Sequence, residues 1–118
     1  MTEEMKRELE QAGIRTEQAL ERFMGNEMLL ERFLKKFLDD PNYGKLMKAM
    51  EEGDPKRAFE AAHTLKGVAG NLSMEPLMDA AGRITEALRK DRWEEAEALK
   101  PRIRAVYEET AGALKRIF

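Results

Sequence analysis

The sequence predicts an all-α protein that folds as an antiparallel up-and-down helical bundle. Ala, Leu, Met, Glu, Lys and Arg dominate the 118 residues, and these residues lose little rotamer freedom in a helix. No stretch alternates β-branched and polar residues, and only four Pro and eight Gly interrupt the chain. Connections between the expected helices are short, which favours antiparallel packing of successive long helices.

The first half of the chain is expected to hold short helices separated by turn-forming residues. Residues 1–15 are expected to form an N-terminal arm or a short, loosely held helix, because their apolar positions are sparse. Residues 16–118 are then the bundle domain. Thr16 and Asn26 have side chains that suit helix N-caps. The helices expected in this half cover residues 16–24, 27–39 and 43–52.

Longer helices are expected in the second half. The pair Asp54-Pro55 is typical of an N-cap followed by Pro in the first helical turn, and Asp91 is expected to cap the last helix. Pro101 lies inside the apolar pattern of that last helix, and we expect it to kink the helix near residues 97–99. The helices expected here cover residues 55–72, 75–90 and the stretch from Asp91 to about residue 117.

Composition excludes several classes of function. The chain has no Cys and one His. This excludes disulfides, thiolate metal sites and any site that needs two imidazoles. Its net charge of −2 lacks the basic excess typical of nucleic-acid binders. The apolar runs fall far short of the roughly 20 residues that a membrane span needs, and the acidic N-terminus does not resemble a secretory signal. We therefore expect a cytoplasmic domain with neither nucleic-acid binding nor membrane insertion.

His63 draws attention because of its neighbours on the expected helix 55–72. At about 100° per residue, it lies roughly a third of a turn from the centre of the apolar arc. Gly67 and Gly70 follow it one and two turns later on the same flank, and Lys66 lies between this flank and the core edge. The apolar arc consists of Phe59, Ala62, Leu65, Ala69 and Leu72.

The two glycines favour a functional interpretation of this flank. Each Gly costs about 1 kcal/mol relative to Ala inside a helix, and a half-exposed flank does not need them for packing. Bare backbone beside His63 would let the surface of another protein come close. A nucleophilic imidazole with bare backbone and one cation beside it suggests a group that accepts phosphate. A lone His in a bundle is more often a boundary residue, but the combination with Lys66, Gly67 and Gly70 favours function.

Other candidate sites are weaker. The paired glutamates stand beside Lys or Arg at supportive spacing and are better explained as solvated helix faces. Glu60 precedes His63 by three residues, but without a second His a di-iron carboxylate site is very improbable. The eight Met residues are typical core fillers. Phe33, Phe37 and Phe59 are expected mainly in the core, and any of them that borders the His63 flank could also form an apolar docking rim.

The segment from His63 to Leu72, HTLKGVAGNL, resembles the phosphorylation motif of the histidine-containing phosphotransfer (HPt) domains of bacterial phosphorelays. The resemblance implies a four-helix bundle with a short additional N-terminal helix. It also implies that phosphate is carried on the distal nitrogen of His63, that Lys66 helps hold the phosphoryl group, and that Gly67 leaves space for an incoming receiver domain. Gly70, Phe59 and Thr64 are expected at the same docking surface.

The expected function is a phosphocarrier that accepts phosphate from a receiver-domain aspartate on His63 and passes it to another receiver. The expected partners are response-regulator receiver domains and a hybrid sensor kinase. No Gly-rich phosphate loop is present, so we expect no ATP-dependent autophosphorylation, no enzyme activity and no cofactor on this chain. Mg²⁺ is expected on the partner receiver domain.

Two alternatives and one local question stay open. The chain could be a phosphate-independent helical interaction module, or the dimerising His-bearing domain of a sensor kinase. The kinase domain normally has an acidic residue after its His, where this chain has Thr64, and we expect a monomer. Ser73 stands where the HPt family commonly has Gly. It either takes a left-handed conformation, at about 1–2 kcal/mol, or caps the following helix.

Overall fold

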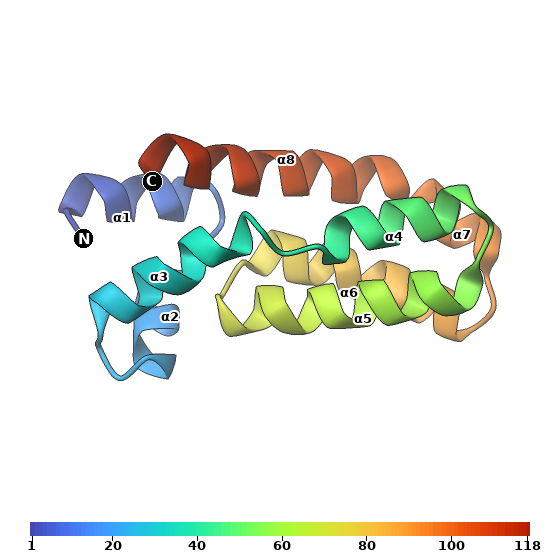
Figure 1. The fold of residues 1–118 in the computed structure, drawn as a ribbon, viewed down its shortest axis with the longest axis horizontal. Helices are drawn as coiled ribbons and strands as arrows, with labels where there is room; N and C mark the ends of the chain where they lie inside the picture. Colours follow the sequence, from blue (N-terminus) through green and yellow to red (C-terminus); the bar gives the residue numbers. More distant parts are fainter.

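The computed structural model describes residues 1–118, which form eight α-helices and no β-strand (Figure 1). The all-α prediction is confirmed. In chain order the helices are α1 (Glu3–Gln11), α2 (Thr16–Arg22), α3 (Glu27–Phe37), α4 (Asn42–Glu51), α5 (Pro55–Asn71), α6 (Glu75–Arg89), α7 (Trp93–Ala98) and α8 (Lys100–Ile117).

A four-helix bundle is formed by α4, α5, α6 and the α7–α8 pair. Consecutive elements pack together: α4 against α5, α5 against α6, and α6 against both α7 and α8. The bundle closes between α4 and α8, where the rings of Tyr43 and Tyr107 stack with centroids 3.9 Å apart. The short helices α1 and α2 lie with α3 at the opposite end of the molecule from α7 (Figure 1).

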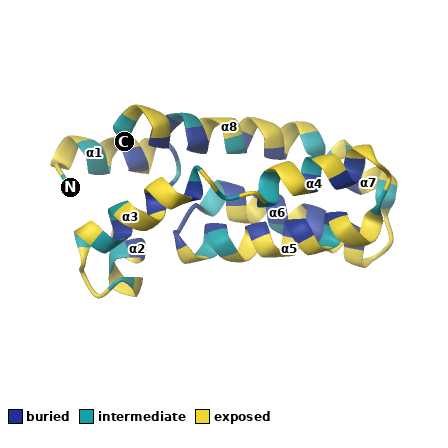
Figure 2. Ribbon diagram, viewed as in Figure 1, coloured by how far each residue is buried: buried dark blue, intermediate teal, exposed yellow.

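The core follows the apolar faces that the helical spacing predicted. Along α5, Ala62, Leu65 and Ala69 have no exposed surface and Leu72 has almost none, whereas Phe59 is half-buried. The opposite side of α5 is exposed (Figure 2). The helix therefore has one solvent-exposed face along its whole length, and the candidate site lies on this face.

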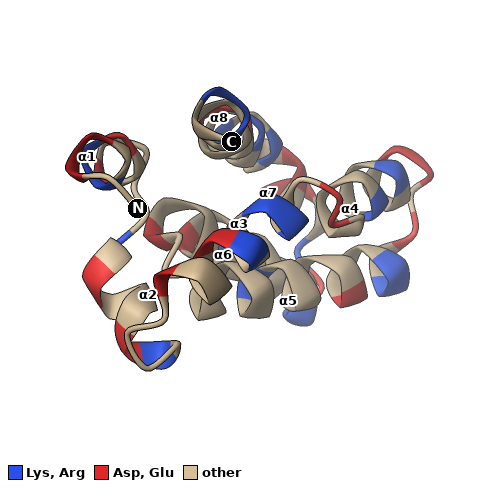
Figure 3. Cartoon of the chain, turned by 60° about the vertical axis from the view of Figure 1, so that its left-hand side comes forward, with Lys and Arg blue, Asp and Glu red and all other residues tan.

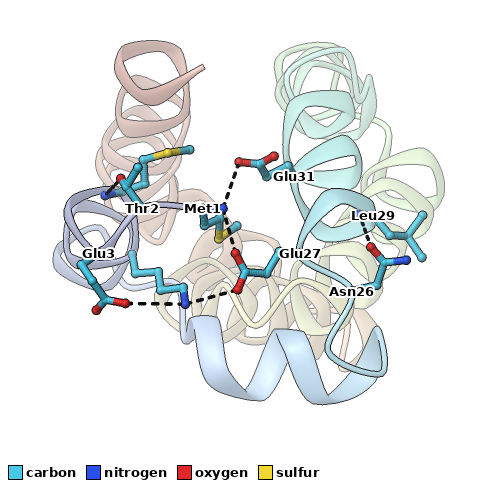
Figure 4. A network of polar contacts seen from close by, with 9 residues as sticks. Met1, Thr2, Glu3, Asn26, Glu27, Leu29 and Glu31 are labelled. Carbon is cyan, nitrogen blue, oxygen red and sulfur yellow. Dashed lines mark hydrogen bonds and ion pairs between the residues drawn. The ribbon is translucent and has the colours of Figure 1, made fainter.

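The N-terminal segment is part of the core rather than loosely held. Leu9 and Ile14 have no exposed surface, and α1 lies beside α8 (Figure 1). The Met1 amine donates to the Glu27 carboxylate at 2.8 Å, and Lys6 donates to the same carboxylate at 3.4 Å (Figure 4). These contacts tie α1 to α3. The division of the chain at residue 15 stays a prediction.

Two of the expected N-caps are confirmed and two are wrong. The side chains of Asn26 and Asp54 accept hydrogen bonds from the backbone N–H groups three residues later, at 3.0 and 3.2 Å. Thr16 is instead the first residue of α2 and is buried, and the N-cap position is occupied by Arg15. Asp91 does not cap the last helix, because it terminates the preceding one with a φ of 58°.

The ends of α5 and α6 share one geometry, the Schellman motif. After α5, Ser73 has a φ of 54°, and the N–H of Met74 donates to the carbonyl of Ala69 at 2.8 Å. After α6, the N–H of Arg92 donates to the carbonyl of Ala87 at 2.8 Å, around the left-handed Asp91. Ser73 therefore takes the left-handed alternative and does not cap α6, whose N-cap residue is Met74.

Pro101 interrupts the last helix completely instead of kinking it. α7 ends at Ala98, and Pro101 is the second residue of α8. In the first turn of a helix the missing N–H has no intrahelical partner to lose, so a restart costs less than a continuous helix with Pro inside it. The stretch expected as one last helix is therefore two helices, α7 and α8, joined at Leu99.

Charges of both signs are distributed over the bundle. Most of the helices in Figure 3 carry Lys or Arg as well as Asp or Glu. Three ion pairs join residues three or four apart on one helix, such as Arg83 with Asp79 at 3.0 Å. None of the helices has the length and apolar character that a membrane crossing requires.

Candidate functional site

His63 lies on the exposed side of α5, one helical turn after Phe59. The two rings are parallel within 2°, and their centroids are 5.8 Å apart. The guanidinium of Arg89, from α6, lies 5.5 Å from the centroid of the Phe59 ring. The aromatic contact limits the orientations of the imidazole, while His63 as a whole stays exposed to solvent.

A shallow depression of about 390 Å³ surrounds His63. Four of the predicted site residues line it, all from α5: His63, Lys66, Gly67 and Gly70. The remaining lining residues are Arg22 from α2, Asn71 at the end of α5 and Met78 from α6. The structure thus brings the predicted nucleophile, cation and two glycines together at one surface.

The side chain of Lys66 crosses from α5 towards α6. A Cβ placed on Gly82 of α6 would lie 3.5 Å from Cε of Lys66 and 3.6 Å from its Cδ. The bare backbone of Gly82 therefore provides a surface on which the lysine stem packs. No carboxylate lies within 4.0 Å of the Lys66 ammonium, in contrast to those of Lys6 and Lys100. Lys66 therefore places an unpaired positive charge at the depression.

The two glycines of α5 have different surroundings. A Cβ on Gly67 would meet nothing within 4 Å. A Cβ on Gly70 would come within 3.2 Å of Sδ of Met78. A side chain at Gly70 would therefore require a small displacement of Met78, whereas a side chain at Gly67 would meet no other part of the chain.

Phe59 and Thr64 do not line the depression. Phe59 contacts it only through its ring stacking with His63. The Thr64 hydroxyl donates to the backbone carbonyl of Glu60 at 2.9 Å, and Thr64 lines a separate polar groove of about 470 Å³ between α4 and α5. The docking roles of both residues stay predictions.

Sequence reasoning missed three residues of the depression. Arg22 and Met78 come from other helices, and nothing near His63 in the sequence points to them. Asn71 lies eight residues after His63 on the same helix, so helical spacing could have found it. The guanidinium of Arg22 donates a hydrogen bond to the hydroxyl of the buried Ser73.

An apolar groove of about 430 Å³ lies beside the depression. Arg22 and Asn71 line both, so the two hollows adjoin each other. Phe33 is 41% exposed at this groove, and its ring contacts Phe23 with centroids 5.2 Å apart. The apolar lining residues are Phe23, Phe33, Phe37, Val68 and Leu72. Of the three phenylalanines expected in the core, only Phe37 is buried there.

The fold and the site define an all-α bundle that presents its one histidine on an exposed helix face. The chain belongs to the Hpt domain family, since the family model described as Hpt domain matches residues 3–113. Membership of this family implies histidine phosphotransfer in phosphorelays. No curated protein and no solved structure matches the chain.

Proposed function

We propose that this chain is a phosphocarrier that accepts a phosphoryl group from a receiver-domain aspartate on His63 and passes it to a second receiver. The observation that carries the proposal is the position of His63. It is the only imidazole in the chain, it is exposed on α5, and it shares a depression with an unpaired lysine. Its family implies phosphotransfer on histidine.

The transfer is a displacement at phosphorus. The lone pair of the distal ring nitrogen of His63 attacks the phosphorus of the aspartyl phosphate. An N–P bond forms, the P–O bond to the aspartate breaks, and the aspartate leaves as a carboxylate. The proton on the other ring nitrogen stays in place, and the reverse sequence delivers the group to the next receiver. The Mg²⁺ for both steps belongs to the receivers.

Lys66 is proposed to hold the phosphoryl group once it is on His63. Its ammonium has no carboxylate partner, and its stem packs over Gly82. A charge-assisted hydrogen bond to a phosphoryl oxygen is worth roughly 1.5–3 kcal/mol when well formed. This stabilisation applies only to the phosphorylated state, so Lys66 tunes the balance between phosphohistidine and aspartyl phosphate.

Docking of the receiver is proposed on the exposed face of α5. Gly67 offers bare backbone with no atom within 4 Å of a would-be Cβ, which supports close approach of another surface. The apolar groove beside the depression supplies a surface for hydrophobic contact, and Phe59, Thr64 and Gly70 lie along the same helix. We propose that the carrier acts as a monomer without an ATP site of its own.

The test is phosphorylation of His63→Gln. Wild type and variant are incubated with a receiver that carries labelled aspartyl phosphate, and acid-labile label on this chain is measured. We expect label on the wild type and none on the variant, with unchanged helical circular dichroism, because His63 is exposed. Glu94→Gln, at an exposed glutamate of α7 that does not line the depression, serves as the control variant. Label retained on His63→Gln would overturn the assignment.

A further inference from the structure

Arg22 is an arginine whose charge is fixed in position without being neutralised. Five arginines of the chain pair with carboxylates, namely Arg15, Arg57, Arg83, Arg89 and Arg92. Arg22 pairs with none. Its guanidinium instead donates to the neutral hydroxyl of Ser73. Ordering a long side chain costs conformational entropy, and here the ordering leaves the positive charge available to another molecule.

Ser73 is an unexpected residue for its backbone conformation. Its φ of 54° lies in the left-handed region, which Gly adopts without strain. Its side chain is nevertheless buried, and its hydroxyl is the acceptor for Arg22. A glycine here would relieve the strain but would remove the acceptor. The serine thus exchanges some backbone stability for a fixed guanidinium.

The surroundings of Arg22 indicate which chemical group it can bind. Arg22 lines the depression together with Gly70 and Asn71. Its guanidinium is held at Ser73, ten residues beyond His63, whereas Lys66 follows His63 by three residues, so Arg22 enters the depression from the end of α5 that is farther from the histidine. The apolar groove of Phe23, Phe33, Phe37, Val68 and Leu72 adjoins it. A molecule bound here would offer an anion next to apolar side chains.

Resting on the phosphocarrier role proposed above, we propose that Arg22, held by Ser73, binds a carboxylate on the docking surface of the receiver. That carboxylate is flanked by apolar side chains that enter the adjoining groove. Arg22 then contributes to the affinity and choice of receiver, and Ser73 is a positioning residue. Neither residue takes part in bond formation at His63.

The experiment separates docking from chemistry by using two phosphodonors. Phosphoramidate, a small donor, reports on His63 alone. A purified receiver domain, chosen from a panel as the fastest exchange partner of the wild type, reports on docking as well. We expect Arg22→Gln to raise the half-saturating receiver concentration about tenfold, the value of one charge-assisted hydrogen bond. Its rates at saturating receiver and with phosphoramidate should match the wild type.

Ser73→Gly provides the sharper variant because it should raise the stability of the protein while lowering its affinity for the receiver. The melting temperature should rise by about 2–5 °C as backbone strain is relieved, while the half-saturating concentration rises about threefold. Asp91→Gly is the matched control, since Asp91 occupies the same position of a second Schellman motif. It should raise the melting temperature and leave receiver exchange unchanged. Arg22→Lys should retain part of the affinity, because the charge survives.

Three results would overturn the inference. Unchanged half-saturation in Arg22→Gln at low salt would show that no carboxylate meets Arg22. If the rate of phosphorylation of Arg22→Gln by phosphoramidate fell as much as its exchange with the receiver, Arg22 would act on the phosphoryl group or on the fold. Failure of the wild type to accept phosphate from either donor would overturn the phosphocarrier role itself, and this inference with it.

Discussion

Gly13 lies directly against the ring of Pro76. A Cβ on Gly13 would come within 2.6 Å of Cγ of Pro76, and the φ of Gly13 is +88°. Beside this contact, Ile14 forms an isolated antiparallel bridge with Met74, and the N–H of Arg15 donates to the carbonyl of Ser73 at 2.9 Å. The connection before α2 is therefore anchored on the turn between α5 and α6.

Gly13→Ala should be strongly destabilising for two combined reasons. The alanine would have to adopt a left-handed conformation and would also collide with Pro76. We expect a loss of about 2–4 kcal/mol in the free energy of unfolding, measured with urea. Gly25→Ala is the matched control, because Gly25 has a φ of +78° with nothing within 4 Å of a Cβ. It should lose only about 1 kcal/mol, and equal losses would contradict the close contact.

Gly67→Ala should stabilise the protein by up to about 1 kcal/mol, since alanine favours the helix and open space awaits its Cβ. Gly70→Ala should gain less stability than Gly67→Ala, because the side chain of Met78 has to move aside. Urea unfolding of both variants checks this order.

A larger side chain at Gly67 tests its proposed role in access. Gly67→Gln should slow exchange with a receiver, whereas Gly44→Gln, at an exposed helical glycine of α4 with equally open surroundings, should not. If the two variants exchange phosphate at equal rates, Gly67 is not needed for approach of the partner.

Lys66→Met tests the charge of Lys66 while keeping an apolar stem over Gly82. The unphosphorylated protein should change in stability by less than about 0.5 kcal/mol. The equilibrium with a receiver should shift towards the receiver by about tenfold or more, because the phosphoryl contact is lost. Partition of label at equilibrium measures this. Lys48→Met, on the groove between α4 and α5, should partition like the wild type; if Lys66→Met does too, Lys66 is only a solvated lysine.

The contacts of Glu27 predict a loss of stability in acid. The Met1 amine, which hydrogen-bonds to it, and the nearby Lys6 lower the pKa of Glu27 below its ordinary value of 4.5. Glu27 therefore favours the folded state fully above its unfolded pKa, and this contribution disappears as pH falls through the lowered folded pKa.

Urea midpoints at neutral pH and near pH 3 measure this contribution. The wild type should lose more stability on acidification than Glu27→Gln, whose neutral side chain does not titrate. Glu94→Gln, at an exposed glutamate that forms no ion pair, should behave like the wild type. A Glu27→Gln variant with the same acid sensitivity would contradict the link between α1 and α3.

Helix positions could be predicted from the sequence because apolar spacing and local caps determine them. Asn26 and Asp54 act through hydrogen bonds that span three residues, so the information is local. The left-handed conformation of Asp91 could not be predicted, and that of Ser73 was one of two alternatives, because side chains other than glycine take that conformation only when surrounding contacts compensate. The break at Pro101 was expected as a kink, since spacing alone does not show whether a helix bends or restarts.

The same distinction between local and long-range information applies to the residues of the candidate site. His63, Lys66, Gly67 and Gly70 share one helix, so their proximity follows from 3.6 residues per turn. Arg22 reaches the site because the segment before α2 is anchored on the turn at Ser73. That anchor involves residues about 60 positions apart in the chain, such as Ile14 and Met74. No local pattern encodes such a contact.

The open surroundings of His63 also have a kinetic consequence. Because His63 is exposed and the depression around it is shallow, a partner needs no opening step in this chain before it reaches the imidazole, and side-chain rotation on the picosecond to nanosecond scale is sufficient. In the proposed transfer, the frequency of exchange then follows encounters between the two proteins, typically about 10⁵–10⁷ M⁻¹s⁻¹ for oriented docking. Between encounters water reaches the same nitrogen–phosphorus bond, so the lifetime of that bond would set how long a received signal persists.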